Sequence, residues 1–207
     1  MTGRRIVVHH CRPGSVSPGL FTPGDAVFFD DCLWSQYRFV LDNVKSMRGV
    51  RVVMGFSPGL ARPSGAAPIR FMESYKAHAA VNRAMSAPGD PPPDEIRAFM
   101  SVDEVRELSE IDGVEIAMHG CMHLKLEPVA GKARRLELFR RDAEAGAELF
   151  GRCGFRAGVF VYPYAFCEDG YDYAVKRLGF RESYAKPGAY RIAVENLDDE
   201  HSCIEDS

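Results

Sequence analysis

The run Val27-Phe28-Phe29-Asp30-Asp31 constrains this chain more than any other stretch, because an apolar segment ends abruptly on two adjacent carboxylates. Such a run is typical of a buried strand with the two acids at its C-terminal tip. Neighbouring residues of a strand project in different directions, so the two carboxylates can take different roles. One alternative is that they cap the positive N-terminal end of the following helix.

Strand-like runs alternate with helical patterns along the chain. The expected strands are Arg5–His9, Asp25–Phe29, Val50–Phe56, Val114–Met118 and Gly158–Val161, with two more near Ser183 and Ile192. The expected helices begin at Trp34 and after the capping box Ser101/Glu104, and cover Ile69–Met85, Lys132–Phe150 and Asp169–Leu178. This alternation predicts an α/β fold with a parallel sheet or barrel.

The 207 residues suit a single domain, and we expect residues 1–207 to form one. Residues 57–100 are an irregular insertion rich in proline and glycine, with a helix of its own. It is expected to be either a lid, substrate wall or oligomer contact, or a merely structural cap. Residues 196–207 are polar and acidic and are expected to form a frayed tail.

Composition excludes several classes of partner. The net charge of −3 offers no basic field, so neither nucleic acid nor an anionic membrane surface is expected to bind. No apolar run is long enough to span a membrane, and no secretory signal follows Arg4-Arg5, so we expect a cytoplasmic protein. The six cysteines contain no Cys-x-x-Cys pair and are expected to be reduced, buried thiols. Dinucleotide-binding and P-loop glycine motifs are absent.

Polar residues follow four of the expected strands, where parallel α/β folds place their sites. They are His9 and His10, Asp30 and Asp31, His119 and His123, and Tyr164. One turn of helix would put His119 and His123 on the same side, and Gly120 permits a sharp bend between them. Two histidines and a carboxylate form a frequent ligand set for catalytic zinc. The alternative is a loop with two partly exposed histidines.

Three segments together resemble the motifs of the NodB-homology polysaccharide deacetylases, the family-four carbohydrate esterases. Phe29-Asp30-Asp31-Cys32 is similar to the family's Thr-Phe-Asp-Asp-Gly motif. His119-Gly120-Cys121-Met122-His123 is similar to His-Ser/Thr-x-x-His, and Val161-Tyr162-Pro163-Tyr164-Ala165 to Arg-x-Pro-Tyr-Gly. Their order and approximate separation also match, across residues 26–166.

The resemblance implies a distorted (β/α) barrel of about seven parallel strands. It also implies that Asp31, His119 and His123 bind one divalent metal ion, with zinc expected and Co, Ni, Mn or Mg as alternatives. Asp30 would act as the general base, and the backbone N–H of Tyr164 would help to hold the oxyanion. The implied activity is a metal-dependent carbohydrate N-deacetylase, a hydrolase of linear amide bonds in carbohydrate metabolism.

Some positions depart from the family pattern. The motif arginine that steadies the base falls on Val161, and Cys32 and Ala165 replace glycines. Asp169-Gly170-Tyr171-Asp172-Tyr173 imitates a further motif but comes too early, so we interpret it as a helix start. The late histidine that supplies the general acid has no clean counterpart. The candidates for that acid, or for another pocket position, are His201, His9 and His10, and strand alternation lets only one of the last two face the site. His78 is expected at a surface position on the insertion helix.

The leading hypothesis is an enzyme that removes the acetyl group from an N-acetylated sugar or glycan precursor. One alternative keeps the metal but changes the bond, as in hydrolysis of a formamide. Another is a non-catalytic glycan-binding domain that kept the scaffold, which Val161 and the missing acid motivate. A homo-oligomer is left open.

Overall fold

A computed structural model describes residues 4–9, 16–85, 94–185 and 190–191. Its strands are β1 Arg5–Val8, β2 Ala26–Phe29, β3 Arg51–Phe56, β4 Val114–Met118, β5 Val159–Val161, β6 Glu182–Tyr184 and β7 Tyr190–Arg191. They form one sheet in the order β6-β5-β4-β3-β2-β1-β7. Every pairing between neighbours in this order is parallel. The C-terminal ends of the strands therefore share one rim of the sheet.

The helices fall where the apolar periodicity predicts them. The α-helices are α1 Trp34–Asn43, α2 Ser74–Met85, α3 Val102–Ser109, α4 Lys132–Arg152 and α5 Tyr171–Arg177. Short 3₁₀ helices are η1 Pro18–Leu20, η2 Val44–Ser46, η3 Pro58–Leu60, η4 Asp94–Ala98 and η5 Pro163–Ala165. The predicted capping box at α3 is confirmed, because Ser101 Oγ accepts from Glu104 N and Glu104 Oε2 accepts from Ser101 N. The insertion helix begins at Ser74, five residues later than expected.

Strand alternation divides the core into two parts. The larger cluster lies between the sheet and its helices and includes Val27, Phe29, Met54 and Phe160. The residues between these in the strands point the other way and form a smaller cluster of Phe28, Val53, Ala117, Val159 and Val161. On the second face of the sheet, side chains from the strands pack against one another in this smaller cluster.

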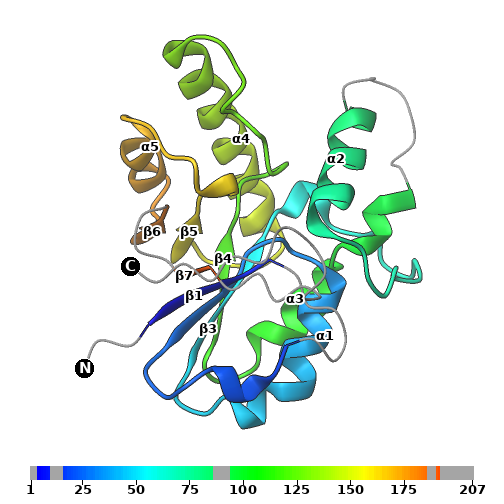
Figure 1. Cartoon of the computed structure of the whole chain (residues 1–207). Helices are drawn as coiled ribbons and strands as arrows, with labels where there is room; N and C mark the ends of the chain where they lie inside the picture. The colour runs from blue at the N-terminus through cyan, green and yellow to red at the C-terminus, as the bar shows by residue number, and fades with distance from the viewer. Residues whose placement is uncertain (1–3, 10–15, 86–93, 186–189, 192–207) are drawn as a thin grey trace.

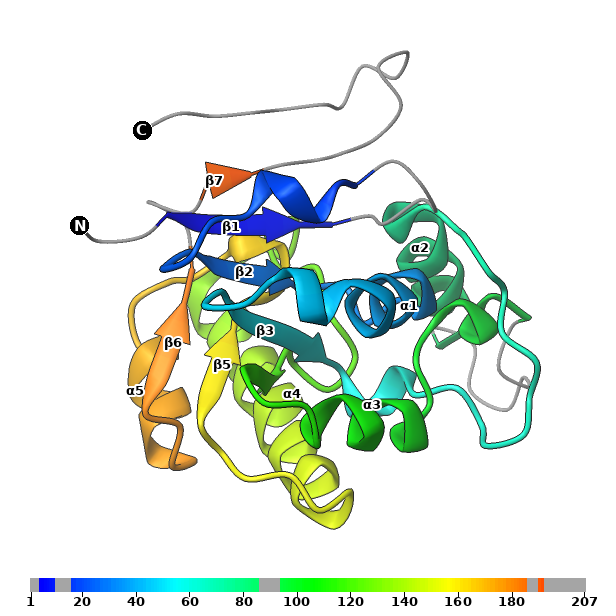
Figure 2. The ribbon, with the colours of Figure 1, turned by 90° about the horizontal axis from the view of Figure 1, so that it is seen from below.

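The sheet curls strongly, as Figure 2 shows. The Phe28 ring on β2 lies 4.8 Å from the Tyr184 ring on β6, although three strands separate β2 from β6 in the sheet order. The Arg5 guanidinium on β1 also lies over the Tyr184 ring, at 5.3 Å. Side chains from the two halves of the sheet thus meet across its inner face.

The predicted parallel α/β architecture is confirmed. Helices α1, α3, α4 and α5 lie on the outside of the curved sheet, and α2 stands beyond the ends of the central strands (Figures 1 and 2). Within the described residues the order is an open one, with β6 and β7 at its two ends, so closure into a barrel stays a prediction. No helix in the described part of the chain is long and apolar enough to cross a membrane. The predicted tail at 196–207 lies outside the described residues.

Candidate active site

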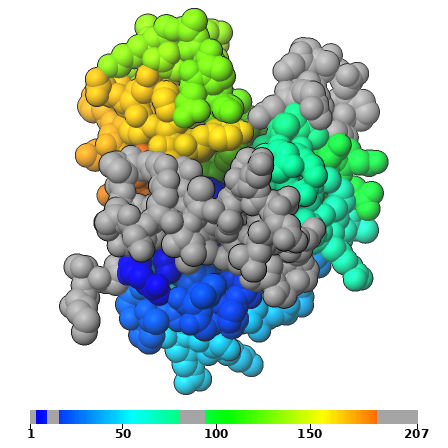
Figure 3. Space-filling view, in the orientation of Figure 1, coloured from blue at the N-terminus to red at the C-terminus, as the bar shows by residue number. Residues whose placement is uncertain are grey.

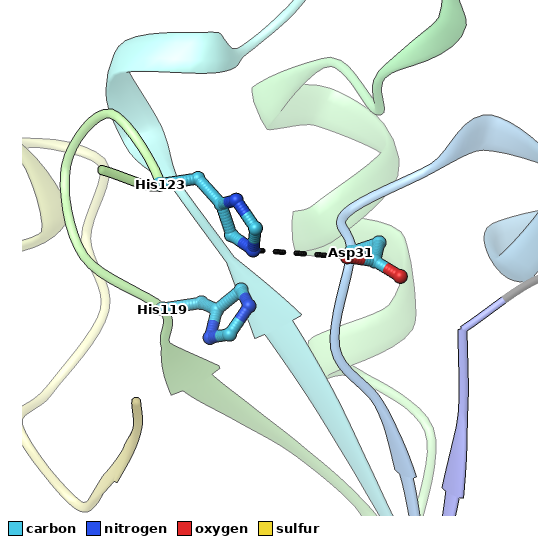
Figure 4. A group of neighbouring side chains, drawn as sticks. All are labelled: Asp31, His119 and His123. Atoms are coloured by element: carbon cyan, nitrogen blue, oxygen red, sulfur yellow. Dashed lines mark ion pairs between the residues drawn. The ribbon is translucent and has the colours of Figure 1, made fainter. Parts of the chain in front are cut away.

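The two motif histidines and the second motif aspartate meet at the C-terminal rim of the sheet. Asp31 follows β2, His119 follows β4, and His123 lies further along the loop between β4 and α4; all three are buried. One ligand atom from each residue lies within 4.8 Å of the others. Figure 4 shows the three side chains pointing toward one another, with His123 Nε2 3.7 Å from Asp31 Oδ1. The predicted convergence of these segments is confirmed.

His119 is held so that one ring nitrogen faces the cluster. Its Nδ1 lies 2.8 Å from the Val161 carbonyl oxygen, a contact that favours a proton on Nδ1 and a bare Nε2. Nε2 is buried and has no hydrogen-bond partner within the described residues. Burial lowers the pKa of His119, and burial together with the neighbouring histidines lowers that of His123 well below its usual value. Both imidazoles are therefore held in the neutral form that binds metal ions.

The loop between the two histidines is not the helical turn that the four-residue spacing suggested. Residues 119–128 contain no helix, and the chain reverses through left-handed backbone at Gly120, with φ of 70°, and at His123, with φ of 51°. Asp142 on α4 holds this reversal, because its carboxylate accepts from Cys121 N at 2.8 Å and Met122 N at 2.9 Å. The physical reason is tertiary: the half-buried Asp142 carboxylate satisfies loop N–H groups that a helix would have paired internally.

The loop after β3 supports the same turn from the other side. Ser57 Oγ donates to the His119 carbonyl oxygen at 2.7 Å, and Gly59 N donates to the Cys121 carbonyl oxygen at 3.0 Å. A Cβ on Gly59 would lie 2.9 Å from that same oxygen. The segment from His119 to His123, the histidine loop, thus has its backbone packed between α4 and the segment after β3.

Asp30 points to the inner face beside His9. His9 Nδ1 lies 3.0 Å from Asp30 Oδ1 and 3.4 Å from Asp31 Oδ2. Burial disfavours a charged imidazole, but the Asp30 carboxylate, and then Asp31, outweigh burial and raise the pKa of His9 well above its usual value. Of the pair His9 and His10, His9 faces the site, whereas His10 lies outside the described residues.

The capping alternative for the two aspartates is wrong. Helix α1 begins at Trp34 with Leu33 as its N-cap, and the side chain of Gln36 accepts from Leu33 N at 3.0 Å. The sheet also fits closely around Asp30, since a Cβ on Gly55 of β3 would lie 2.7 Å from the Asp30 carbonyl oxygen. The paired acids are therefore placed by strand packing and not by the helix.

His78 does not lie at the predicted surface position. Its side chain is buried, and its Nε2 lies 3.4 Å from Asp31 Oδ1. Burial alone would raise the pKa of Asp31, but His78 and His9 beside it outweigh burial and lower that pKa well below its usual value. Sequence reasoning missed this residue because α2 belongs to an irregular insertion, where no strand end marks the direction of a side chain.

The aromatic turn lies on the other side of the cluster. Its Tyr164 has left-handed backbone, with φ of 56°, and its ring lies 4.6 Å from that of His123. Val161, at the motif arginine position, contributes only its carbonyl oxygen to the site, through His119. The predicted helix after this turn is confirmed as α5, where Asp172 accepts from Tyr162 Oη at 2.5 Å.

A cavity of about 380 Å³ opens over these groups. Asp30, Asp31 and His123 contribute to its lining, and Tyr75, Lys125 and Tyr164 carry aromatic and cationic groups there. Tyr75 is 58% exposed, and the Lys125 ammonium lies 5.6 Å above the Tyr164 ring. Helix α2 therefore forms one wall of the cavity. Of the candidate acids, His201 lies outside the described residues.

The donor set fits a divalent metal ion. One carboxylate and two neutral imidazoles form a common set for catalytic zinc, which leaves positions open for other ligands. The bare, buried Nε2 of His119 has no partner within the described residues, which is costly unless an ion binds there. A parallel α/β sheet with this cluster at its C-terminal rim is the arrangement that the motif resemblance implies for the NodB-homology deacetylases.

Comparison with known proteins agrees with that class. No protein-family model matches the chain, and no curated protein sequence does. Solved structures do match: IcaB from Ammonifex degensii aligns over 94% of this chain and 93% of its own, with TM-score 0.61 and 17% identity. The BpsB deacetylase domain from Bordetella bronchiseptica aligns over 90% and 89%, with TM-score 0.60 and 16% identity.

A third match is a de-N-acetylase from Aggregatibacter actinomycetemcomitans, with TM-score 0.55 and 18% identity. It aligns over 78% of this chain, which spans 62% of its length. At such identities the likeness shows the fold. The chain therefore has the NodB-homology deacetylase fold that its three motifs resemble.

Proposed function

We propose that this chain is a metal-dependent hydrolase that removes the acetyl group from an N-acetylated sugar or glycan precursor. The observation that carries the proposal is the buried cluster of Asp31, His119 and His123, with ligand atoms within 4.8 Å of one another, at the strand rim of a deacetylase fold. Neither the fold nor the cluster alone would be sufficient, because the same fold can host unrelated functions.

Asp31, His119 and His123 would hold one divalent ion, and zinc is the expected one. When bound, the ion supplies Lewis-acid polarisation of the acetyl carbonyl and lowers the pKa of water at the site. The protein's part is to keep both imidazoles neutral and fixed, which burial and the Val161 carbonyl do for His119. The curled sheet and the histidine loop hold the three ligands in place.

Asp30 is the proposed general base. Its carboxylate lies beside the ligand Asp31 and lines the cavity, where it can take a proton from an attacking water molecule. His9 takes the orienting place that the motif arginine has in the family, because its Nδ1 lies 3.0 Å from Asp30 Oδ1. The backbone N–H of Tyr164 is the proposed donor to the developing oxyanion.

The cavity wall suits a sugar ring. Tyr75 and Tyr164 offer aromatic surfaces for the apolar face of a pyranose, and Lys125 offers a cation beside Tyr164. A glycan or a small N-acetylated precursor is therefore the proposed substrate class. A cytoplasmic location and a homo-oligomeric state stay predictions.

The test is acetate release from a panel of N-acetylated sugars by protein reconstituted with Zn, Co, Ni, Mn or Mg. We expect Asp30→Asn to lower kcat about 10²–10⁴-fold with metal binding retained, because only proton transfer is lost. Asp31→Ala and His119→Ala should lose both metal and activity. Asp42→Ala, at an exposed position 56% accessible to solvent, is the matched control and should behave as wild type.

An active Asp31→Ala/His119→Ala double variant would contradict the mechanism. Product analysis by mass separates loss of acetyl from loss of formyl, the nearest alternative chemistry. Tight glycan binding without turnover across all five metals would favour the non-catalytic alternative instead.

A further inference from the structure

His78 is a residue of the insertion whose side chain contacts the cluster of Asp31, His119 and His123. It lies on α2, is 2% exposed, and stands between two rings. Its imidazole stacks on that of His123, with centroids 3.8 Å apart and planes inclined by 17°. The Phe99 ring lies on it edge-on, at 5.1 Å and 62°. The position of the His78 ring is therefore fixed by packing on both sides.

One ring nitrogen of His78 faces the cluster. Its Nε2 lies 3.4 Å from Asp31 Oδ1, the same oxygen that faces His123 Nε2 at 3.7 Å. Neither ring nitrogen of His78 has a hydrogen-bond partner of good geometry within the described residues. Leaving a buried imidazole unsatisfied costs about 1–3 kcal/mol, so the residue needs a reason to be there.

Direct ligation together with His123 does not suit the geometry. The lone pair of an imidazole nitrogen lies in the ring plane, and the planes of His78 and His123 are nearly parallel at 17°. An ion on the lone-pair axis of His123 therefore lies well off the plane of His78. The cluster of ligand atoms within 4.8 Å contains Asp31, His119 and His123 and does not contain His78.

We propose that His78 is a positioning residue of the metal centre, which fixes the ring of His123 by stacking and limits the movement of the Asp31 carboxylate through the 3.4 Å approach of its Nε2. This inference rests on the proposed metal-dependent function. Groups that orient metal ligands are typically required for tight binding, and their loss costs about 10–100-fold in metal affinity. The insertion is then part of the metal centre and not a spacer.

Hydrogen bonds and an ion pair fix the segments of the insertion on either side of α2. Ile69 N donates to the Arg97 carbonyl oxygen at 2.8 Å, and Arg97 Nε donates to the Ala67 carbonyl oxygen at 2.8 Å. Arg62 pairs with Glu104 of α3 at 2.5 Å and is buried. In Figure 3 the blue-green atoms around α2 lie at the surface of the molecule, to the right of the yellow segment that follows β5. The segments before and after α2 are thus joined to each other, and Arg62 ties the insertion to α3.

Two substitutions separate the two contacts. His78→Leu removes both the ring face and the donor while keeping an apolar side chain. His78→Gln loses the stack but can place an amide nitrogen near the Nε2 position. Lys76→Ala on the same helix, at a side chain 55% exposed and paired with Glu73, is the control. The readouts are the Zn²⁺ dissociation constant by chelator competition, the visible spectrum of the Co²⁺ form, and thermal unfolding of the metal-free proteins.

We expect His78→Leu to weaken Zn²⁺ binding about 10–100-fold and to change the Co²⁺ spectrum. His78→Gln should bind Zn²⁺ more tightly than His78→Leu but less tightly than the wild type. The control Lys76→Ala should keep the wild-type affinity. Wild-type affinity in His78→Leu would overturn the inference, as would a loss as complete as that of His119→Ala, which would indicate ligation. If the wild-type protein binds no divalent ion, the proposed function fails first, before any variant is compared.

Discussion

At the scale of single residues, backbone strain collects in the three motif segments. Among the described residues, the non-glycine positions with positive φ are Cys32 at 59°, His123 at 51°, Tyr164 at 56° and Ala165 at 53°. Left-handed backbone costs a residue with a Cβ about 1–2 kcal/mol, and such strain collects at functional sites. Cys32 and Ala165 stand where the motifs they resemble have glycine, the residue that adopts left-handed backbone without strain.

Ala165→Gly is expected to stabilise the protein by about 0.5–1 kcal/mol, because relief of the left-handed strain exceeds the added entropy of the unfolded chain. The measurement is the free energy of unfolding in denaturant. Ala145→Gly, at an exposed position inside α4, is the matched control and should destabilise by about 1 kcal/mol. A loss of stability in Ala165→Gly would show that the left-handed backbone is not strained.

At the scale of elements, α4 fixes the histidine loop. Asp142 accepts from two loop N–H groups, and a Cβ on Gly120 would lie 2.7 Å from its Oδ2. Burial raises the pKa of Asp142, and the two N–H donors offset only part of this effect. A Cβ on Gly146 would lie 3.1 Å from Cys121 N, so the helix also needs glycine to approach the loop.

Asp142→Ala should therefore destabilise the protein by about 1–3 kcal/mol, since two buried N–H groups lose their acceptor. It should also weaken metal binding, because His123 would no longer be held. Hydrogen exchange at the amides of Cys121 and Met122 is the specific readout and should become faster. Asp142→Asn keeps one acceptor oxygen, so its stability and its amide exchange rates should lie between those of the wild type and Asp142→Ala. Unchanged exchange at both amides would contradict this role of α4.

Local patterns predicted most of the elements and the meeting of the three proposed ligands. The bounds of β4 at Val114–Met118 and the capping box of α3 follow from short-range apolar and polar spacing, which the structure confirms. The approach of Asp31 to His119 and His123 followed from the common rim of parallel strands. The turn at His123 and the inward position of His78 depend on Asp142 and Phe99, far along the chain, so spacing could not predict them.

The cysteines also show that local sequence patterns do not predict the burial of every side chain. Cys32 and Cys121 are buried free thiols, as predicted, but Cys167 is exposed. Burial of a single small residue depends on which face its segment presents to the core. No periodic pattern around Cys167 carries that information, because it lies between η5 and α5.

At the scale of the whole molecule, side chains join the two halves of the curled sheet at its N-terminal rim. Arg51 on β3 pairs with Glu115 on β4 at 2.6 Å and with Glu182 on β6 at 3.0 Å. Its Nη1 also donates to Tyr184 Oη at 3.1 Å. The contacts with Glu182 and Tyr184 bridge β3 and β6, which do not pair through the backbone, so they hold the curvature of the sheet.

Arg51→Met should destabilise the protein by about 1 kcal/mol, a modest value because Arg51 and its partners are partly exposed to solvent. Metal affinity should stay at the wild-type value, since the network lies at the rim opposite the ligands. Denaturant unfolding and the Zn²⁺ dissociation constant are the two measurements. Arg38→Met, which removes an exposed pair with Asp42, should change stability by less than about 0.5 kcal/mol. A Zn²⁺ affinity that falls with Arg51→Met would contradict the separation of the two rims.

That separation has a practical consequence for handling the protein. Arg51 and Phe56 are the two ends of β3, and five steps of about 3.3 Å place the two rims roughly 17 Å apart. A dye, a surface linker or a cross-link attached near Arg51 would sit behind the sheet, with the cavity facing away from the attachment. The protein could then be immobilised or labelled at that rim while the cavity lined by Tyr75 and Tyr164 stays open to ligands.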